Sequence, residues 1–88
     1  MRKMAEEKPI GEVTHYYNKI GVAVIKLTAG SLKVGQTIHI QGYSSDFVQE
    51  VSSMQIQHQD IKEAKKSDEF GLKTDQPVRE GDKVYLVE

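Results

Sequence analysis

Three histidines, His15, His39 and His58, are the residues of this sequence that most readily suggest chemistry. Histidine binds metals and transfers protons near neutral pH. A metal site needs several such ligands held together, and these three fall on separate predicted strands, without paired spacing and without any cysteine in the chain. We therefore expect ordinary strand histidines, no bound metal and no cofactor.

Neighbouring carboxylates and serines give no stronger catalytic signal. Asp68-Glu69 and Glu6-Glu7 are adjacent pairs, and adjacent residues of an extended chain point to opposite faces, so neither pair forms an acid/base dyad. Ser44-Ser45 and Ser52-Ser53 lack a His and Asp arranged to activate a nucleophile, and they suit a turn and a bulge. The sequence therefore predicts a chain that is not an enzyme.

Two aromatic residues beside a cation form the best candidate contact surface. Tyr16, Tyr17 and Lys19 are expected at the tip of the first hairpin, where they could stack on a base or a ribose. The alternative is that Tyr17 closes one end of the core and that Lys19 is simply solvated. Tyr43 and Arg79 are further candidates for contact with RNA or a protein partner, and their alternative is rim packing and a solvated charge.

Composition narrows the class of protein. Eighty-eight residues make one domain, and 12 Lys and Arg against 13 Asp and Glu give a net charge of −1, which argues against tight, sequence-independent binding of nucleic acid. The longest apolar run, residues 20–25, is far shorter than the roughly 20 residues of a membrane span. With no apolar segment behind the N-terminal charges and no cysteine, we expect a cytoplasmic protein.

A turn pattern that occurs twice, 46 residues apart, organises the chain. In each copy an apolar residue precedes a glycine, Gly35 or Gly81, and an alternating strand follows. Glycine accepts the positive φ of a sharp reversal, and the next residue, Gln36 or Asp82, can bond to the turn backbone. The two copies of the pattern align at six positions, which favours two structurally similar halves over the chance recurrence of a common turn.

The alternation of apolar and polar residues predicts six strands, at 10–17, 20–27, 37–41, 47–58, 69–73 and 83–87. A one-residue bulge near 52–53 would reconcile the two phases of the fourth strand, and residues 61–66 read as a loop with one helical turn. Alternation also places Val13, His15 and Tyr17 on one face, with His15 and His58 inward.

These strands indicate an all-β fold, a small closed six-stranded antiparallel β-barrel. The barrel is expected to span residues 9–88, after a disordered tail at 1–8.

The order Val22-Ala23-Val24, then Gly30 to Gly42, then Val51 and Met54, and finally Val78 to Val84 resembles domain 2 of translational GTPases such as elongation factor Tu. The resemblance covers about residues 10–88 and implies the same barrel. Stand-alone elongation factor-like proteins and the small barrel appended to collagenase-like peptidases share this pattern.

The phosphate loop G-x-x-x-x-G-K-[ST] is missing, and Gly21 stands where guanine recognition after Asn18-Lys19 needs Asp, so no GTP binding is expected. The resemblance implies a non-catalytic translation elongation factor-like barrel that binds RNA or a ribonucleoprotein. The alternative is a protein-interaction module that docks on a separate enzyme of the peptidase type.

Overall fold

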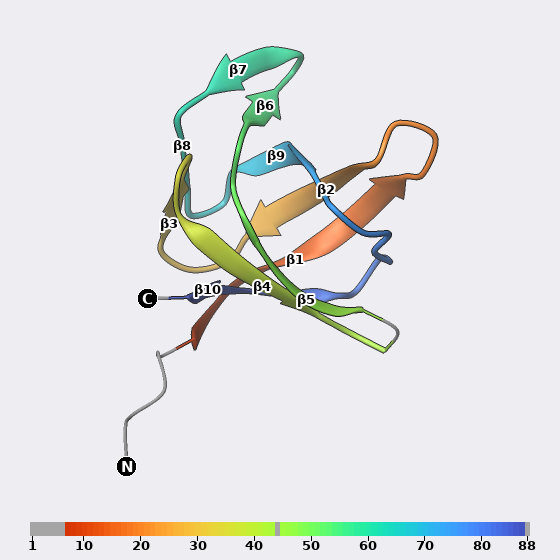
Figure 1. Cartoon of the computed structure of the whole chain (residues 1–88). Coiled ribbons are helices and arrows are strands. Elements are labelled where there is room, and N and C mark those ends of the chain that lie inside the picture. The colour runs from red at the N-terminus through yellow and green to blue at the C-terminus, as the bar shows by residue number, and fades with distance from the viewer. Residues whose placement is uncertain (1–6, 44, 88) are drawn as a thin grey trace.

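The computed structural model describes residues 7–43 and 45–87, and all regular structure within them is β-strand (Figure 1). The strands are β1 (Glu7–Tyr17), β2 (Val22–Leu27), β3 (Ser31–Lys33), β4 (Thr37–Gln41), β5 (Asp46–Glu50), β6 (Met54–Ile56), β7 (Gln59–Ile61), β8 (Glu63–Lys65), β9 (Glu69–Lys73) and β10 (Lys83–Val87). Within these described ranges no helix is long and apolar enough to cross a membrane.

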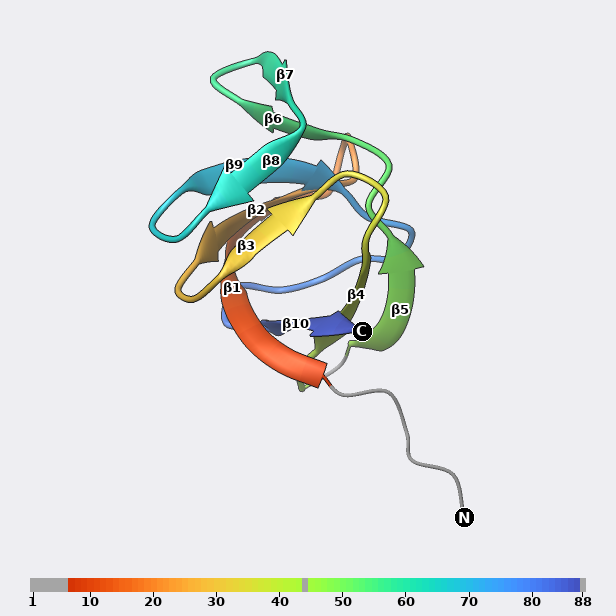
Figure 2. The same ribbon diagram turned by 90° about the vertical axis from the view of Figure 1, so that its left-hand side faces the viewer.

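Eight strands form one antiparallel sheet in the order β5-β4-β10-β1-β2-β9-β6-β7, and β3 pairs with β8 separately. The sheet curls around a shared interior, as the two views at right angles show (Figures 1 and 2). Alternation fills that interior because every second residue of a strand points to the same face. The long side chains with almost no exposure include Ile25, Leu27, Ile38, Ile40 and Phe70.

The predicted closed barrel is wrong, because the sheet is open and its edge strands are β5 and β7. A side chain spans the gap beside β5: Gln49, only 5% exposed, donates its amide to Lys73 O at 3.0 Å and accepts a bond from Asp75 N at 2.8 Å. These side-chain bonds link the edge strand β5 to the end of β9, and no backbone ladder joins β5 to the other edge strand, β7, among the described residues. β5 ends at Glu50, and the backbone of the next residue, Val51, bonds to the turn before β4. Gly35 N donates to Val51 O, and Val51 N donates to Gln36 O.

Several strand boundaries also differ from the prediction. The long strand at 47–58 is two strands, β5 and β6, separated by residues 51–53. Residues 61–66, predicted as a loop with a helical turn, contain the end of β7 and all of β8, and residues 31–33 form the unpredicted β3. These short strands exist because they pair with distant partners, Leu32 with Ala64 and Met54 with Leu72, and both pairs are buried.

A bulge in β1 corrects the predicted facing of its residues. The pairing with β2 runs Val13↔Ile25 and then His15↔Val24, so Thr14 is the extra residue. One extra residue reverses every side chain beyond it. Val13 is buried as predicted, but His15 and Tyr17 face outward and Tyr16 packs against the core.

The two turns singled out by the repeat have the same hydrogen bonds. Gly35 and Gly81 have φ of 99° and 95°. The side chain of Gln36 accepts a bond from Lys33 N at 2.8 Å, and that of Asp82 accepts one from Arg79 N at 3.0 Å. The two turns differ in the burial of this side chain: Asp82 is buried beneath an otherwise exposed turn, whereas Gln36 is partly exposed.

A third turn repeats this pattern without a glycine. Asp68 Oδ2 accepts a bond from Lys65 N at 2.9 Å, and Ser67 takes the left-handed position with φ of 80°.

Of the predicted N-terminal tail, residues 1–6 lie outside the described residues. Glu7 and Lys8 are already part of β1, opposite Val87 and Leu86 of β10.

Candidate docking groove

A groove of about 340 Å³ runs over the outer face of the sheet between the β1–β2 hairpin tip and the β6–β7 hairpin. We call it the outer groove and define it by Tyr17, Ile20, Val22, Ile56, His58 and Gly71. Its size is at the lower end of the range of sites that take small ligands or single peptide side chains. A smaller hollow of about 180 Å³ shares Val22 and Gly71 with it and continues toward Lys73.

The floor of the outer groove is low because a glycine occupies an outward position in the middle of β9. Gly71 lies opposite Val24 of β2 and Gln55 of β6. A Cβ at Gly71 would lie 3.3 Å from Val22 Cγ1, so any side chain there would fill the hollow. Glycine inside a strand weakens the strand and commonly marks a place that another chain or ligand approaches.

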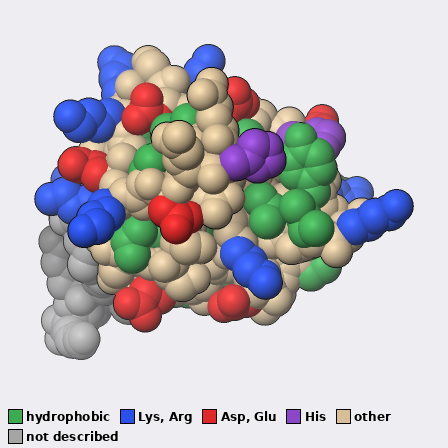
Figure 3. All heavy atoms as spheres, turned by 90° about the horizontal axis from the view of Figure 1, so that it is seen from above, with side chains coloured by type: hydrophobic (Ala, Val, Ile, Leu, Met, Phe, Trp, Pro, Cys, Tyr) green, Lys and Arg blue, Asp and Glu red, His purple; other side chains and the backbone are tan. Residues whose placement is uncertain are grey.

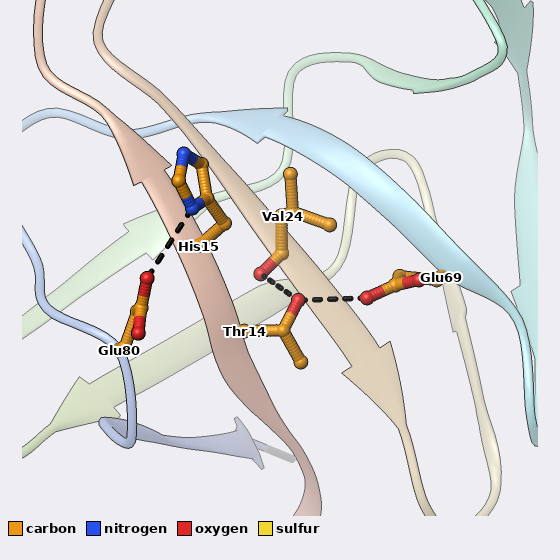
Figure 4. A network of polar contacts seen from close by, with 5 residues as sticks. All are labelled: Thr14, His15, Val24, Glu69 and Glu80. Atoms are coloured by element: carbon orange, nitrogen blue, oxygen red, sulfur yellow. Dashed lines mark hydrogen bonds and ion pairs between the residues drawn. The ribbon is translucent and has the colours of Figure 1, made fainter.

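One wall comes from the β1–β2 hairpin tip. Tyr17 and Ile20 are 50% and 61% exposed, which is high for large apolar side chains. The rings of His15 and Tyr17 meet edge to face with centroids 4.3 Å apart. His15 Nδ1 lies 3.2 Å from Glu80 Oε2 (Figure 4). Because of the bulge at Thr14, the ring of Tyr17, which packs against His15, faces the groove.

The opposite wall is the β6–β7 turn. β6 pairs with β9 only at Met54↔Leu72 and Gln55↔Gly71, so the hairpin separates from the sheet beyond Gln55. Its two-residue turn consists of Gln57 and His58, with φ of 53° and 67°, and both side chains line the groove.

A carboxylate marks one end of the outer groove. Glu69 Oε2 lies 2.8 Å from Thr14 Oγ1, which is also 3.2 Å from Val24 O, so the single hydroxyl proton goes to one acceptor at a time (Figure 4). Glu69 is the one Asp, Glu, Lys or Arg among the residues that line the 340 Å³ hollow. The groove thus combines an apolar surface with one fixed negative charge.

The space-filling view from above shows hydrophobic side chains gathered at one end of the molecule, over the β1–β2 hairpin tip, with histidine side chains beside them (Figure 3). The exposed apolar residues that belong to the groove, Tyr17 and Ile20, lie at this hairpin tip. Apolar surface that collects beside a hollow, instead of being scattered singly, is typical of a binding site.

The structure places only one of the five predicted contact residues in the groove. Tyr17 lines it, Lys19 is exposed on the same turn, and Tyr16 packs against the core. Tyr43 is fully exposed on the separate β4–β5 turn, and Arg79 is exposed in the loop before β10. The five residues therefore do not form one surface.

The histidines also stay apart. His39 Nε2 lies 2.5 Å from Asp46 Oδ1 on the β4–β5 hairpin, whereas His58 is exposed at the β6–β7 turn and does not point inward. No group of three or more His, Cys, Asp or Glu side chains suited to a metal ion occurs among the residues that the structure describes.

Sequence reasoning missed Ile20, Ile56 and Gly71 as functional candidates, and it considered His58 only as a metal ligand. Only Gly71 carried a usable signal, because a glycine between Phe70 and Leu72 interrupts a predicted strand. The others join the groove through contacts between hairpins, which the local pattern does not contain.

No protein-family model matches the sequence. Among curated proteins, the chain is 48% identical over 79 residues to the uncharacterized protease MJ0090 of Methanocaldococcus jannaschii, which covers 89% of this chain and 19% of that protein. The chain is homologous to a segment of MJ0090. It is also 27% identical over 77 residues to a collagenase of Porphyromonas gingivalis, with 86% of this chain and 21% of the collagenase covered. The chain thus spans about a fifth of the length of the curated relatives it matches.

Two solved structures share the fold. Both are the C-terminal domain of a Geobacillus thermoleovorans protein described as a U32 peptidase, one of them its selenomethionine variant. The TM-scores are 0.82 and 0.79 at 16% sequence identity. The first match covers 98% of both chains, and the second covers 94% of this chain and 98% of the other.

These comparisons correct the assignment to translation and protein biosynthesis. The relatives are named as a protease and as collagenases, and the chains of similar fold come from a protein described as a U32 peptidase. The pattern that resembled a translation factor consists of glycine turns and core positions, which describe a fold and carry no chemistry. Of the two interpretations, the peptidase-associated one is supported.

Proposed function

We propose that this chain is a non-catalytic protein-interaction module that docks on a peptidase catalytic domain. The observation that carries the proposal is the 48% identity to a segment that makes up about a fifth of a protein named as a protease. A segment of that size, with its own core, is a module attached to a larger body.

The outer groove supports a docking role. Its large apolar side chains, Tyr17 and Ile20, are held in solvent by the fold, and one wall is built from a turn with two strained residues. Exposed apolar surface beside a hollow is costly unless a partner covers it. The position of the fold at the C-terminal end of the Geobacillus peptidase is consistent with a role beside a catalytic domain.

The test is capture of the partner from the cells that make this chain. The full-length protein carries an affinity tag, and its partner is identified by mass spectrometry. We expect a polypeptide similar to the four fifths of MJ0090 that this chain does not match, either as a separate protein or continuous with the tagged chain. Recovery without any peptidase-like sequence contradicts the proposal.

A further inference from the structure

The outward face of β9 reads as a line of three positions: Glu69, Gly71 and Lys73. All three alternate with the buried Phe70 and Leu72, so they lie on the outer face in this order. Glu69 and Lys73 are exposed, and Gly71 between them has no side chain. Four residue steps of an extended strand span roughly 13 Å. The face therefore presents a negative charge, a hollow and a positive charge along one line.

The hollow at Gly71 is elongated along this line. The larger cavity lies on the Glu69 side and the smaller one on the Lys73 side, and both are lined by Val22, Gln55 and Gly71. A shape that continues on both sides of the same glycine fits a chain that lies along it better than a compact ligand that fills one cavity.

The surface chemistry determines what such a chain must carry. Tyr17 and Ile20 on one wall and Ile56 on the other offer apolar contact above the glycine. At the two ends, Glu69 attracts a cation and Lys73 an anion, with the carboxylate of Glu69 placed by its contact with Thr14. Opposite charges across an interface fix the register of the partner and raise the rate of encounter.

We propose that the outer groove binds an extended segment of the partner peptidase, with an apolar side chain over Gly71, a Lys or Arg beside Glu69 and an Asp or Glu beside Lys73. This inference rests on the proposed docking function and specifies its site and its ligand. The occupant is a polypeptide of the pattern basic, any, apolar, any, acidic, or its reverse, because an extended chain can lie over the strand in either direction.

The experiment uses overlapping synthetic peptides of about twelve residues, long enough to span the line from Glu69 to Lys73. They cover the part of MJ0090 that lies outside the matched segment, and binding to the purified full-length chain is measured by fluorescence polarisation. We expect the peptides that bind to contain the stated pattern. Binding by none of them overturns the proposal, because the proposed ligand is a linear segment.

Two groove variants and two matched controls locate the binding. Gly71→Val fills the hollow and Glu69→Lys reverses the charge, and each is expected to weaken binding about tenfold. Glu50→Lys makes the same charge reversal on β5, and Tyr43→Ala removes a fully exposed aromatic ring on another turn. Both controls should change affinity by less than about twofold.

Exchange of charges separates a direct contact from a structural effect. A peptide in which the basic residue is replaced by Glu should bind Glu69→Lys better than the original chain does. If Gly71→Val lowers the melting temperature, Glu69→Lys and this exchange still decide the question, because Glu69 lies at the surface.

The outcomes separate the groove from the docking function. If the tagged chain captures a peptidase but neither Gly71→Val nor Glu69→Lys weakens binding, the groove proposal is overturned and the docking function stands. If no peptidase is captured and no peptide binds, both are overturned. Sedimentation showing self-association that Gly71→Val abolishes also overturns the proposal, since the occupant would then be a second copy.

Discussion

The glycine turns before β4 and β10 and the turn between β6 and β7 all need positive φ, and they reach it with different residues. Gly35 and Gly81 adopt φ of 99° and 95° without a Cβ clash. Gln57 and His58 adopt φ of 53° and 67° with full side chains. The β6–β7 loop has positive φ at both central residues, as in a type I′ turn, which favours Asn-Gly.

The difference indicates where the chain tolerates strain. At the two turns that precede β4 and β10, glycine adopts the positive φ without strain. At the β6–β7 turn the strain remains, and the two strained residues line the outer groove. Backbone strain clusters at functional sites, but Ser67 also has a left-handed φ of 80° and lies outside the groove, so strain by itself does not mark the site.

The largest expected effect is at one of the two glycine turns. Gly81→Val should lower the free energy of unfolding by about 2–3 kcal/mol, because a β-branched residue at this φ is strongly disfavoured. Beyond Gly81 and its two chain neighbours, no heavy atom lies within 4 Å of a Cβ built at Gly81, so the cost comes from the backbone conformation and not from a clash with another part of the fold. Urea denaturation measures it, with the exposed neighbour Arg79→Ala as the control. Equal stability of both variants would refute the role given to this glycine.

A second effect compares the two glycine turns with each other. Asp82→Ala should cost about 2 kcal/mol, because it removes a buried side chain and leaves Arg79 N without its side-chain partner at a part-buried site. Gln36→Ala should cost about 1 kcal/mol, since Gln36 makes the same bond to Lys33 N at a partly exposed site. The measurement is the same denaturation series. A larger loss for Gln36→Ala than for Asp82→Ala would contradict the ranking by burial.

A third change relieves the strain at the groove. Replacing Gln57 by Asn and His58 by Gly should raise the free energy of unfolding by about 1 kcal/mol, because both residues then suit the turn. The same variant should bind the MJ0090 peptides more weakly, since it removes part of one groove wall. Thermal unfolding and fluorescence polarisation report the two effects. A stabilised variant with undiminished binding would show that the strain serves no docking function.

The smallest effect concerns the third turn, which has the bonding of the glycine turns without their glycine. Ser67→Gly should raise stability by about 0.5 kcal/mol, as relief of the left-handed φ of 80° is partly offset by the entropy of glycine in the unfolded chain. Ser67→Ala serves as the control, because it removes the hydroxyl and keeps the Cβ. A gain from alanine equal to that from glycine would show that φ is not the cause.

Prediction from the sequence succeeded where the signal was local. The alternating strands at 37–41, 69–73 and 83–87 lie where the pattern places them, because burial of every second residue leaves a direct trace in the sequence. It failed for the three-residue strands β3, β7 and β8, which are too short to show a period, and it joined β6 to β5 in one long strand. For the candidate site, only Tyr17 among the predicted contact residues lies in the outer groove.

Three features of the structure could not be predicted from the sequence. The bulge at Thr14 reverses the facing of His15 and Tyr17, and nothing in the alternation of β1 announces it. The sheet predicted as a closed barrel is open, with β5 and β7 at its edges, and Gln49 links β5 to the end of β9 through side-chain bonds only. The groove requires Gly71 to lie between two hairpins that are distant in the chain.

The sequence by itself determined an all-β chain with two glycine turns, each backed by a side chain that bonds to the turn, because these depend on neighbouring residues alone. Only the tertiary structure decided which residues face outward beyond the bulge, whether the sheet closes, and that Tyr17, Ile20, Ile56 and Gly71 share one surface. The physical reason is that register and strand order are set by pairing between distant segments, where a shift of one residue exchanges the buried face for the exposed one.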